Sequence, residues 1–289
     1  MSRSLPNRTA RPDTLPPSGI ADVKRIRFVI EAADGEIVRR RFTHPRPMLA
    51  VEQPAEFGSR PVDQIWPESF DELCIIRTPA AVPSELQKAT DLWLVGPDHP
   101  DAPKFITIKL DSGSIRWRPG RAVLQGADAM SEGLLGGLID FAFFEGELRR
   151  LEHALVPYEA SAPADVKLAY RIRLDSRPEW ERLDRTMEGL SRLRLSFAGI
   201  EPSLSSASRS LDPESRRIAT RLAIRTGIPA RLESFSNRLE ACEDLYEGAV
   251  DRITDFRGWR RGEILEIIII VLLVIEVVVM LASPFIRLR

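Results

Sequence analysis

The end of the chain carries an apolar run that constrains the fold more than any other feature. Residues 264–282 contain only two charged side chains, Glu266 and Glu276. As a helix rising 1.5 Å per residue, the run would be roughly 28 Å long, close to the ~30 Å hydrocarbon core of a bilayer. The pattern therefore predicts one transmembrane helix at 263–283.

Basic and aromatic side chains flank this run on both sides. Trp259, Arg260 and Arg261 precede it, and Arg287 and Arg289 follow it. Such side chains are typical of the headgroup zone, where their stems stay apolar and their tips stay wet. A helix buried inside a large protein is the alternative for a segment that is apolar all round. The flanks favour the membrane span.

The arginines around the run also predict an orientation and a location. Four of them precede it, at 252, 257, 260 and 261, and two follow it. The positive-inside bias then keeps the N-terminal body on the side of synthesis. The arginine-heavy composition is typical of a GC-rich genome. We therefore expect a bacterial inner-membrane, single-pass protein with a cytoplasmic body; the mitochondrial inner membrane is the alternative.

The composition argues against several classes of function. The 289 residues carry 41 Lys and Arg against 42 Asp and Glu, so no direct nucleic-acid site is evident. Cys74 and Cys242 belong to no motif, which agrees with a reducing compartment. No spacing of candidate ligands or nucleophiles matches a known site. We therefore expect no cofactor, no metal and no enzymatic activity.

The first half of the chain is predicted to be rich in strands. Alternating apolar residues indicate two hairpins, one turning at Asp34-Gly35 and one turning before Gly113. Short apolar runs at 73–76 and 92–95 fit buried strands.

The second half is predicted to be helical. Apolar residues recur at threes and fours from Leu134 to Leu155, and Asp212-Pro213 is an N-cap followed by a first-turn proline. The fold class is therefore α+β, with a strand-rich N-terminal half and a helical C-terminal half that continues into a long amphipathic stalk and the span. The expected parts are a disordered tail at 1–20, a strand-rich subdomain at 21–125, a helical subdomain at 126–227, the stalk at 228–262, the span at 263–283 and a short tail at 284–289.

The stalk carries a heptad pattern typical of a coiled coil, and its register continues into the apolar run. The seam consists of Leu232, Phe235, Leu239, Cys242, Tyr246, Ala249, Ile253 and Phe256. Two interpretations stay open: a coiled coil between copies, or packing on the chain's own helices near 178–204 and 213–225. The flanking charges do not specify a parallel dimer, because Arg252 of one copy would meet Arg257 of the other.

Two groups of charged residues are candidates for a role. Glu276 would lie near the middle of a bilayer, where a charge costs roughly 2.5–3.5 kcal/mol, so it needs a partner or a proton. A hydrogen bond between helices of an oligomer is favoured, and an ion or proton site is the alternative. With Glu266, Trp259, Arg260 and Arg261 it forms the candidate membrane and oligomerisation site. The other group, near 145–153, is interpreted as a salt-bridged surface.

A set of short motifs in the second half carries a family resemblance. They are Phe141-Ala-Phe-Phe-Glu145, Arg177-Pro-Glu-Trp180, Arg231, Asn237-Arg-Leu239, Asp244-Leu245, Leu265-Glu266 and Ile275-Glu276. Over roughly residues 140–283 the chain resembles the required-for-meiotic-nuclear-division family, whose shared domain has no assigned enzymatic activity. Mitochondrial members of this family are inner-membrane proteins that form large homo-oligomers and support translation as tethers for ribosomes. The resemblance therefore implies that this chain also forms large homo-oligomers.

These observations predict a membrane-anchored, oligomeric scaffold or tether without enzymatic activity. Its expected partners are the membrane, further copies of the chain, and a ribosome or another membrane-associated protein complex. The alternative is a relative of the CorA-type divalent-cation channels, which also join an α/β cytosolic domain to the membrane through a long helix. Those channels have two spans and a Gly-Met-Asn motif, and this chain has neither.

Overall fold

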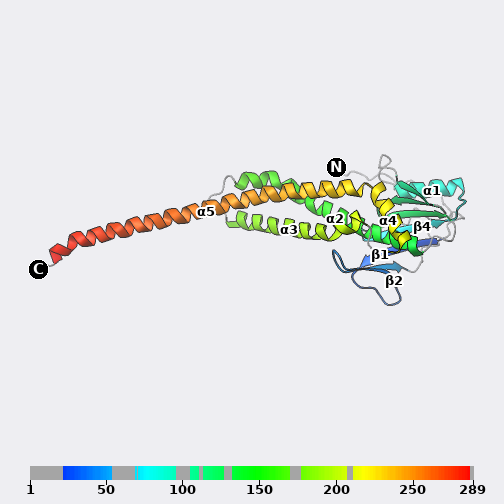
Figure 1. Cartoon of the computed structure of the whole chain (residues 1–289), viewed down its shortest axis with the longest axis horizontal. Coiled ribbons are helices and arrows are strands. Elements are labelled where there is room, and N and C mark those ends of the chain that lie inside the picture. The colour runs from blue at the N-terminus through cyan, green and yellow to red at the C-terminus, as the bar shows by residue number, and fades with distance from the viewer. Residues whose placement is uncertain are drawn as a thin grey trace, which may run out of the picture. The chain divides into compact units, whose positions relative to one another are not determined.

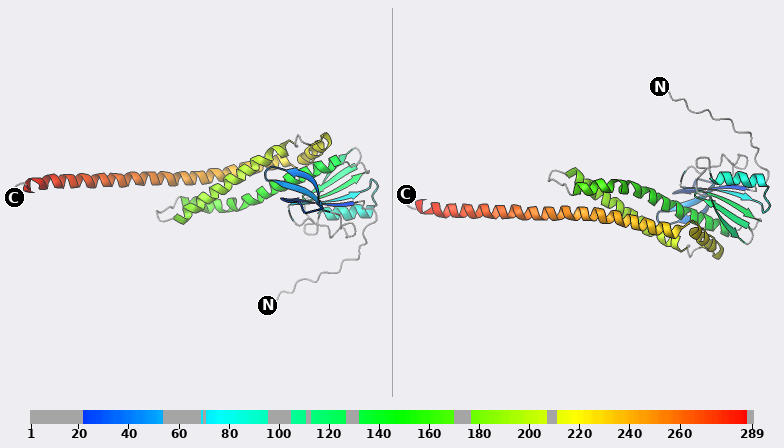
Figure 2. Two further views of the ribbon diagram at one scale, coloured as in Figure 1. Left: turned by 90° about the horizontal axis from the view of Figure 1, so that it is seen from below. Right: turned by 90° about the horizontal axis from the view of Figure 1, so that it is seen from above.

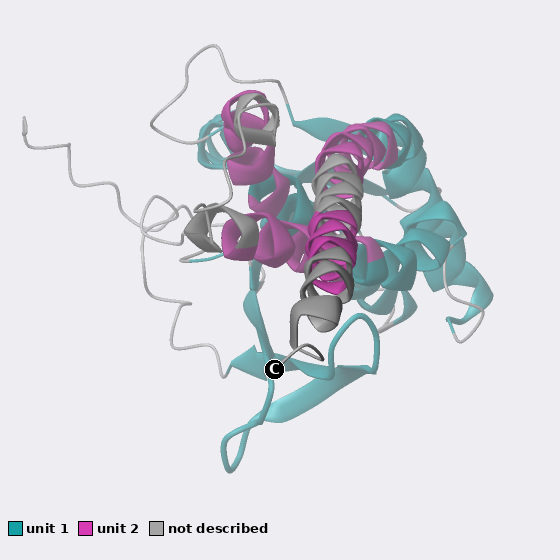
Figure 3. Ribbon diagram, turned by 90° about the vertical axis from the view of Figure 1, so that its left-hand side faces the viewer, with its two compact units in different colours: residues 1–153, 195–234 teal, residues 154–194, 235–289 magenta. Residues whose placement is uncertain are grey.

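The computed structural model describes residues 22–53, 69, 71–95, 105–110, 113–126, 132–169, 177–206 and 211–286. Within these ranges, the side chains of 22, 132, 166–169, 177–180, 252–263 and 277–286 are left out of the description. The expected tail at 1–20 lies outside the described residues. The chain divides into two compact units, unit 1 (1–153 and 195–234) and unit 2 (154–194 and 235–289) (Figure 3).

Unit 1 contains a seven-stranded sheet (Figure 1). Its strands are β1 (Asp22–Val29), β2 (Ile37–Phe42), β3 (Met48–Gln53), β4 (Glu72–Thr78), β5 (Ile106–Leu110), β6 (Gly113–Arg118) and β7 (Arg121–Gly126). Their order is β2-β3-β1-β4-β7-β6-β5, and every neighbouring pair is antiparallel except β4 and β7. A parallel pair needs a crossover connection, and α1 (Ser84–Val95) lies within the one from β4 to β7.

The central strand β4 is buried on both faces. Its residues Leu73, Cys74, Ile75 and Ile76 are all at most 1% exposed. Cys74 and Ile76 belong to a cluster with Val23 of β1, Val123 of β7, and Trp93 and Leu94 of α1. Because successive side chains of a strand point to opposite faces, Leu73 and Ile75 face the other side of the sheet.

Aromatic rings join that other face of the sheet to helix α2 (Glu132–Ala169). The ring of Phe143 on α2 stacks on Phe42 of β2 at 3.9 Å between centroids and lies 5.4 Å from Phe28 of β1. Phe141, also on α2, meets Trp117 of β6 edge to face at 5.3 Å. These large apolar side chains explain why this end of α2 is held against the sheet.

The described residues form three further helices: α3 (Arg177–Ser205), α4 (Pro213–Arg225) and α5 (Ile228–Ile286). Asp212 caps α4 by accepting hydrogen bonds from the backbone N–H groups of Glu214 and Ser215, as expected from the sequence. Gly227 adopts φ +69°, a left-handed conformation that glycine accepts without strain, and so allows the turn from α4 into α5.

Unit 2 is built from parts of three helices: α2 from 154, α3 up to 194 and α5 from 235 (Figure 3). Its buried apolar side chains are Leu155, Ala162, Leu183, Leu190, Phe235, Leu239, Cys242, Tyr246 and Ala249. Helix α5 is continuous, and its C-terminal part extends past the ends of α2 and α3 in both views of Figure 2.

The structure confirms the α+β class and the predicted antiparallel pairing of β5 with β6. The other predicted hairpin is wrong. Strands β1 and β2 exist, but β3 lies between them in the sheet. Residues 92–95 end helix α1 rather than forming a strand. Leu92 is 72% exposed while Trp93 and Leu94 are buried, and so short an apolar run carries no period that would distinguish helix from strand.

The expected transmembrane helix is corrected by the structure. Among the helical residues described, no helix is both long enough and apolar enough to cross a membrane. Two carboxyl groups, Glu266 and Glu276, interrupt the apolar run, and a charge near the middle of a bilayer costs roughly 2.5–3.5 kcal/mol. The expectations of a single-pass C-terminal anchor, of a membrane partner on that basis, and of an inner-membrane location fall with it.

Gly137 permits a close approach between α2 and α4 and offers a test of this packing. A Cβ at Gly137 would lie 2.4 Å from the carbonyl oxygen of Ser215, whereas a Cβ at Gly248 of α5 would meet nothing within 4 Å. We expect Gly137→Ala to lower the free energy of unfolding by about 1–3 kcal/mol through overpacking. Gly248→Ala should raise it by roughly 0.5–1 kcal/mol through helix propensity. Urea denaturation followed by circular dichroism measures both, and equal effects would contradict the packing.

Candidate functional site

The heptad seam is buried by the chain's own helices as far as the side chains are described. Leu232 lies in unit 1, and Phe235, Leu239, Cys242, Tyr246 and Ala249 lie in unit 2; all are at most 6% exposed. Ile253 and Phe256 are helical, but their side chains lie outside the description. The part of the seam from Leu232 to Ala249 is therefore packed within the chain.

The other sequence-derived candidates lie further along α5. Glu266 and Glu276 are exposed on this helix. Trp259, Arg260 and Arg261 are helical, and their side chains lie outside the description. The apolar residues between the two glutamates are exposed as well: Ile267 is 55% exposed, Ile270 53% and Val274 56%. The structure therefore places Glu266 and Glu276 on a helix surface that no described part of the chain covers.

Helix α2 carries the main concentration of buried charge in unit 1. Asp140, Glu145 and Glu147 are 3%, 1% and 8% exposed. A buried carboxylate is costly unless a cation pairs with it. Each of the three meets an arginine from another element: Arg40 from β2, Arg231 from α5 and Arg46 from the segment after β2.

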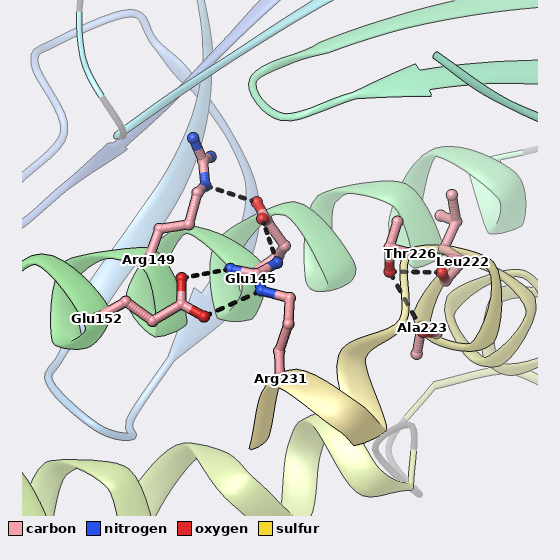
Figure 4. Close-up of polar contacts among 7 residues, drawn as sticks. All are labelled: Glu145, Arg149, Glu152, Leu222, Ala223, Thr226 and Arg231. Carbon is pink, nitrogen blue, oxygen red and sulfur yellow. Dashed lines mark hydrogen bonds and ion pairs between the residues drawn. The ribbon is translucent and has the colours of Figure 1, made fainter. Parts of the chain in front are cut away.

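Arg231 bridges two acids of α2 (Figure 4). Its Nη1 donates to Glu145 at 3.0 Å, while Nε and Nη2 donate to the two oxygens of Glu152 at 3.0 and 2.7 Å. Arg149 donates to the second oxygen of Glu145 at 3.0 Å. Burial disfavours the charged guanidinium, but the hydrogen bonds and charges of Glu152 and Glu145 outweigh it and raise the pKa of Arg231. A bidentate pair of this kind fixes the orientation of the guanidinium and also strengthens the interaction.

The turn before α5 positions Arg231. The hydroxyl of Thr226 donates to the carbonyls of Leu222 at 2.7 Å and Ala223 at 3.2 Å, which closes the end of α4 (Figure 4). Gly227 then reverses the chain, and its carbonyl accepts the backbone N–H of Arg231 at 3.1 Å. The first turn of α5 thereby directs this arginine at α2.

A second cluster joins α2 to the start of β4. Nη2 of Arg46 donates to Glu147 at 2.9 Å and to Asp71 at 3.2 Å. Arg150 pairs with both of these acids as well. Burial raises the pKa of Glu147 and of Asp71, and the charge of Arg46 opposes the rise in each. Two acids and two arginines therefore form a compact, charge-balanced group.

The third acid, Asp140, borders a pocket of about 110 Å³. Arg40 donates from Nε to its Oδ1 at 3.1 Å. Burial raises the pKa of Asp140, against the charge and hydrogen bond of Arg40. The other lining residues are Phe141 and Phe144 of α2, Ser203, Leu204 and Ser205 of α3, Ala219, Thr220, Ala223 and Ile224 of α4, and Pro229 of α5. A mostly apolar pocket with few polar groups and a perturbed carboxyl has the features of a binding site.

Unit 2 repeats the pairing of a buried acid with an arginine. Asp165 of α2 is 2% exposed and forms an ion pair with Arg182 of α3. The hydroxyl of Tyr246 on α5 donates to Asp165 at 2.7 Å and lies 3.0 Å from the hydroxyl of Ser161. Burial raises the pKa of Tyr246, although the bond to Ser161 opposes it. This network ties three helices together.

The charged group near 145–153 is salt-bridged as predicted, but its placement on a surface is wrong for two members. Glu145 and Glu147 are buried, because the arginines that neutralise them come from α5 and from the segment after β2. Asp140 was not among the candidate residues expected from the sequence. A signal was present, since Asp140 and Glu147 stand seven residues apart amid the apolar residues of one helix face.

Among the described side chains, no group of three or more His, Cys, Asp and Glu residues lies close enough together to hold a metal ion.

Comparison with known proteins gives little. No protein-family model and no curated protein matches the chain. The complete structure of the CorA magnesium transporter from Methanocaldococcus jannaschii is 11% identical, with a TM-score of 0.37 over 84% of this chain and 80% of its own. The ZntB cytoplasmic domain from Vibrio parahaemolyticus is 13% identical, with a TM-score of 0.24 over 70% of this chain and 90% of its own. The first agrees loosely with the alternative drawn from the sequence, but likenesses this weak carry no argument.

Removing Arg231 tests whether the buried pairs stabilise unit 1. Glu145 would keep only Arg149, so we expect Arg231→Met to lower the free energy of unfolding by about 3 kcal/mol. Arg192→Met is the matched control, because Arg192 and Glu188 are 74% and 61% exposed and such a pair contributes at most ~0.5 kcal/mol. Urea unfolding measures both variants, and an Arg231 variant as stable as its control would contradict the pairing.

The pH dependence of stability tests the environment of Asp140. Its folded pKa is raised above 3.8, so the folded state holds this proton more tightly than the unfolded state does. The contribution is therefore full below pH 3.8 and is lost as the pH rises through the folded pKa. Relative to Asp140→Asn, the wild-type free energy of unfolding should fall across this window. Parallel pH profiles of the two proteins would show that the carboxyl is unperturbed.

Proposed function

We propose that this protein is a self-associating scaffold without enzymatic activity, assembled through the C-terminal part of α5. The observation that supports this most is the exposed apolar stretch 264–275. Apart from Glu266 its residues are large and apolar, and each of them is between 48% and 60% exposed. Soluble surfaces rarely present so large a contiguous apolar patch without a partner to cover it.

The pattern of side chains on this stretch favours a second copy as that partner. In the register of the seam, Ile267 and Val274 occupy a positions and Ile270 occupies a d position. Branched side chains at both positions favour bundles of three or four parallel helices over pairs. Val271 and Leu273, at e and g, are apolar too, so each helix offers more than one apolar face, as a bundle of several helices requires.

The division of α5 supports the same assignment. Up to Ala249 the seam residues are buried within the chain, so they are not available for packing against another copy. From 264 to 276 the same helix is exposed on every side. Packing within the chain and packing between chains would therefore use successive parts of one helix.

The charged groups support a structural rather than catalytic role. Asp140, Glu145, Glu147 and Asp165 are each committed to an arginine that joins separate elements. Such pairs hold helices and strands in register. Self-association through α5 would then gather several copies of unit 1 in one assembly, which is what a scaffold does.

Sedimentation equilibrium of purified full-length protein tests this function. We expect wild type to have a multiple of the 32.5 kDa chain mass, and the triple variant Ile267→Ser, Ile270→Ser, Val274→Ser to approach the single-chain mass. Leu92→Ser with Leu195→Ser is the control, because these isolated apolar residues are 72% and 75% exposed on unit 1. That control should keep the wild-type mass.

Two results would overturn the assignment. One is a wild-type protein that stays at 32.5 kDa at every concentration. The other is a wild-type monomer that sediments with phosphatidylcholine vesicles, since lipid rather than a second copy would then cover the stretch.

A further inference from the structure

The pocket beside Asp140 lies within unit 1, where four helices meet. Asp140 and Phe144 come from α2, Ser205 from the C-terminal end of α3, Thr220 from α4 and Pro229 from the start of α5. The ion pair with Arg40 engages Oδ1 of Asp140, and the scaffold role does not involve this pocket.

Hydrogen-bond acceptors dominate the polar part of the pocket. Asp140 is 3% exposed, and within the described part of the chain Arg40 alone donates to it, at Oδ1. Its Oδ2 therefore has acceptor capacity to spare. The last residues of α3, from Ser203 to Ser205, also line the pocket. The carbonyl of Pro202 already accepts from Ser206, and the C-terminus of a helix carries about half a negative charge.

Donors are scarce by comparison. The start of α5 would ordinarily offer backbone N–H groups, but the residue it places on the pocket is Pro229, which has none. The hydroxyls of Ser203, Ser205 and Thr220 can donate or accept. A ligand that suits this lining must bring donors, and a positive charge would be favoured by the carboxylate and by the end of α3.

The size and apolar lining limit the rest of the ligand. The pocket volume of about 110 Å³ is somewhat smaller than the ~150 Å³ of cavities that take benzene. Phe141, Phe144, Leu204 and Ile224 supply apolar wall. Aromatic rings next to an ammonium group add a cation–π attraction. A short alkyl or aryl body fits this space, and a large cofactor does not.

We propose that this pocket binds a small primary amine, whose ammonium group donates to Oδ2 of Asp140 and to carbonyls at the end of α3 while its short apolar body lies against Phe144 and Ile224. The site is independent of self-association, because every lining residue belongs to unit 1. The raised pKa of Asp140 agrees with it, since a bound cation would offset the cost of burying that charge.

Three probes of one shape test the proposal on the full-length protein: n-butylammonium, 1-butanol and n-butyrate. Saturation-transfer NMR titrations measure each dissociation constant. We expect butylammonium to bind saturably and at least about tenfold more tightly than butanol, as a charge-assisted hydrogen bond implies, and butyrate to bind most weakly. Butyrate binding as tightly as butylammonium, or no saturable binding of butylammonium, would overturn the proposal.

Two variants then locate the site. Asp140→Asn should lose the preference of butylammonium over butanol, and Asp184→Asn, an exposed acid of unit 2, should keep it. Thr220→Trp, at an exposed position on the pocket, should weaken the binding of both probes by filling the space. Circular dichroism verifies that each variant folds. If Asp140→Asn does not fold, Thr220→Trp decides, and unchanged butylammonium binding by it refutes the assignment.

Discussion

The fold of unit 1 depends on pairing the buried carboxylates of α2. The aromatic residues of this helix hold it against the sheet, and that packing takes Asp140, Glu145 and Glu147 out of water. Unpaired, each charge would cost several kcal/mol, so the fold must bring an arginine to each. Arg40, Arg46 and Arg231 come from positions far away in the sequence, and their pairing fixes β2, the segment after it and the first turn of α5 relative to α2.

Helix α5 contributes side chains to both units. Its first turn supplies Arg231 to unit 1, and its next turns supply the buried seam and Tyr246 to unit 2. From 264 to 275 it presents apolar side chains that no described part of the chain covers. Because a helix that is apolar all round is unfavourable in water, the exposed stretch calls for a partner. We propose that further copies of the chain take that role, as a scaffold would require.

Local patterns predicted part of this architecture well. The N-cap at Asp212, the pairing of β5 with β6 and the long helix containing Phe141 each rest on short-range chemistry, and the structure has all three. The insertion of β3 between β1 and β2 could not be predicted in this way. It depends on long-range pairing, such as Phe28 opposite Ala50, that no local turn signal specifies.

The charged and apolar sites were harder to predict. Periodicity identified the seam of α5 but could not decide what covers it, because one stripe suits the chain's own helices or another copy equally well. The length of the apolar run suggested a membrane span that the described helices do not support. The pocket at Asp140 depends on four helices meeting, so sequence spacing gave no sign of it.

Disulfide cross-linking between copies tests whether the exposed stretch of α5 mediates self-association. Ile270→Cys places a thiol at a d position of the exposed stretch, and Leu272→Cys places one at the outward f position. A disulfide needs Cα atoms within about 7 Å, which d positions of neighbouring parallel helices approach and f positions do not. Cys74 and Cys242 are buried and should not interfere. We expect efficient cross-linking of the Ile270 variant and little of the Leu272 variant under mild oxidation. Equal yields, or none for either variant, would contradict it.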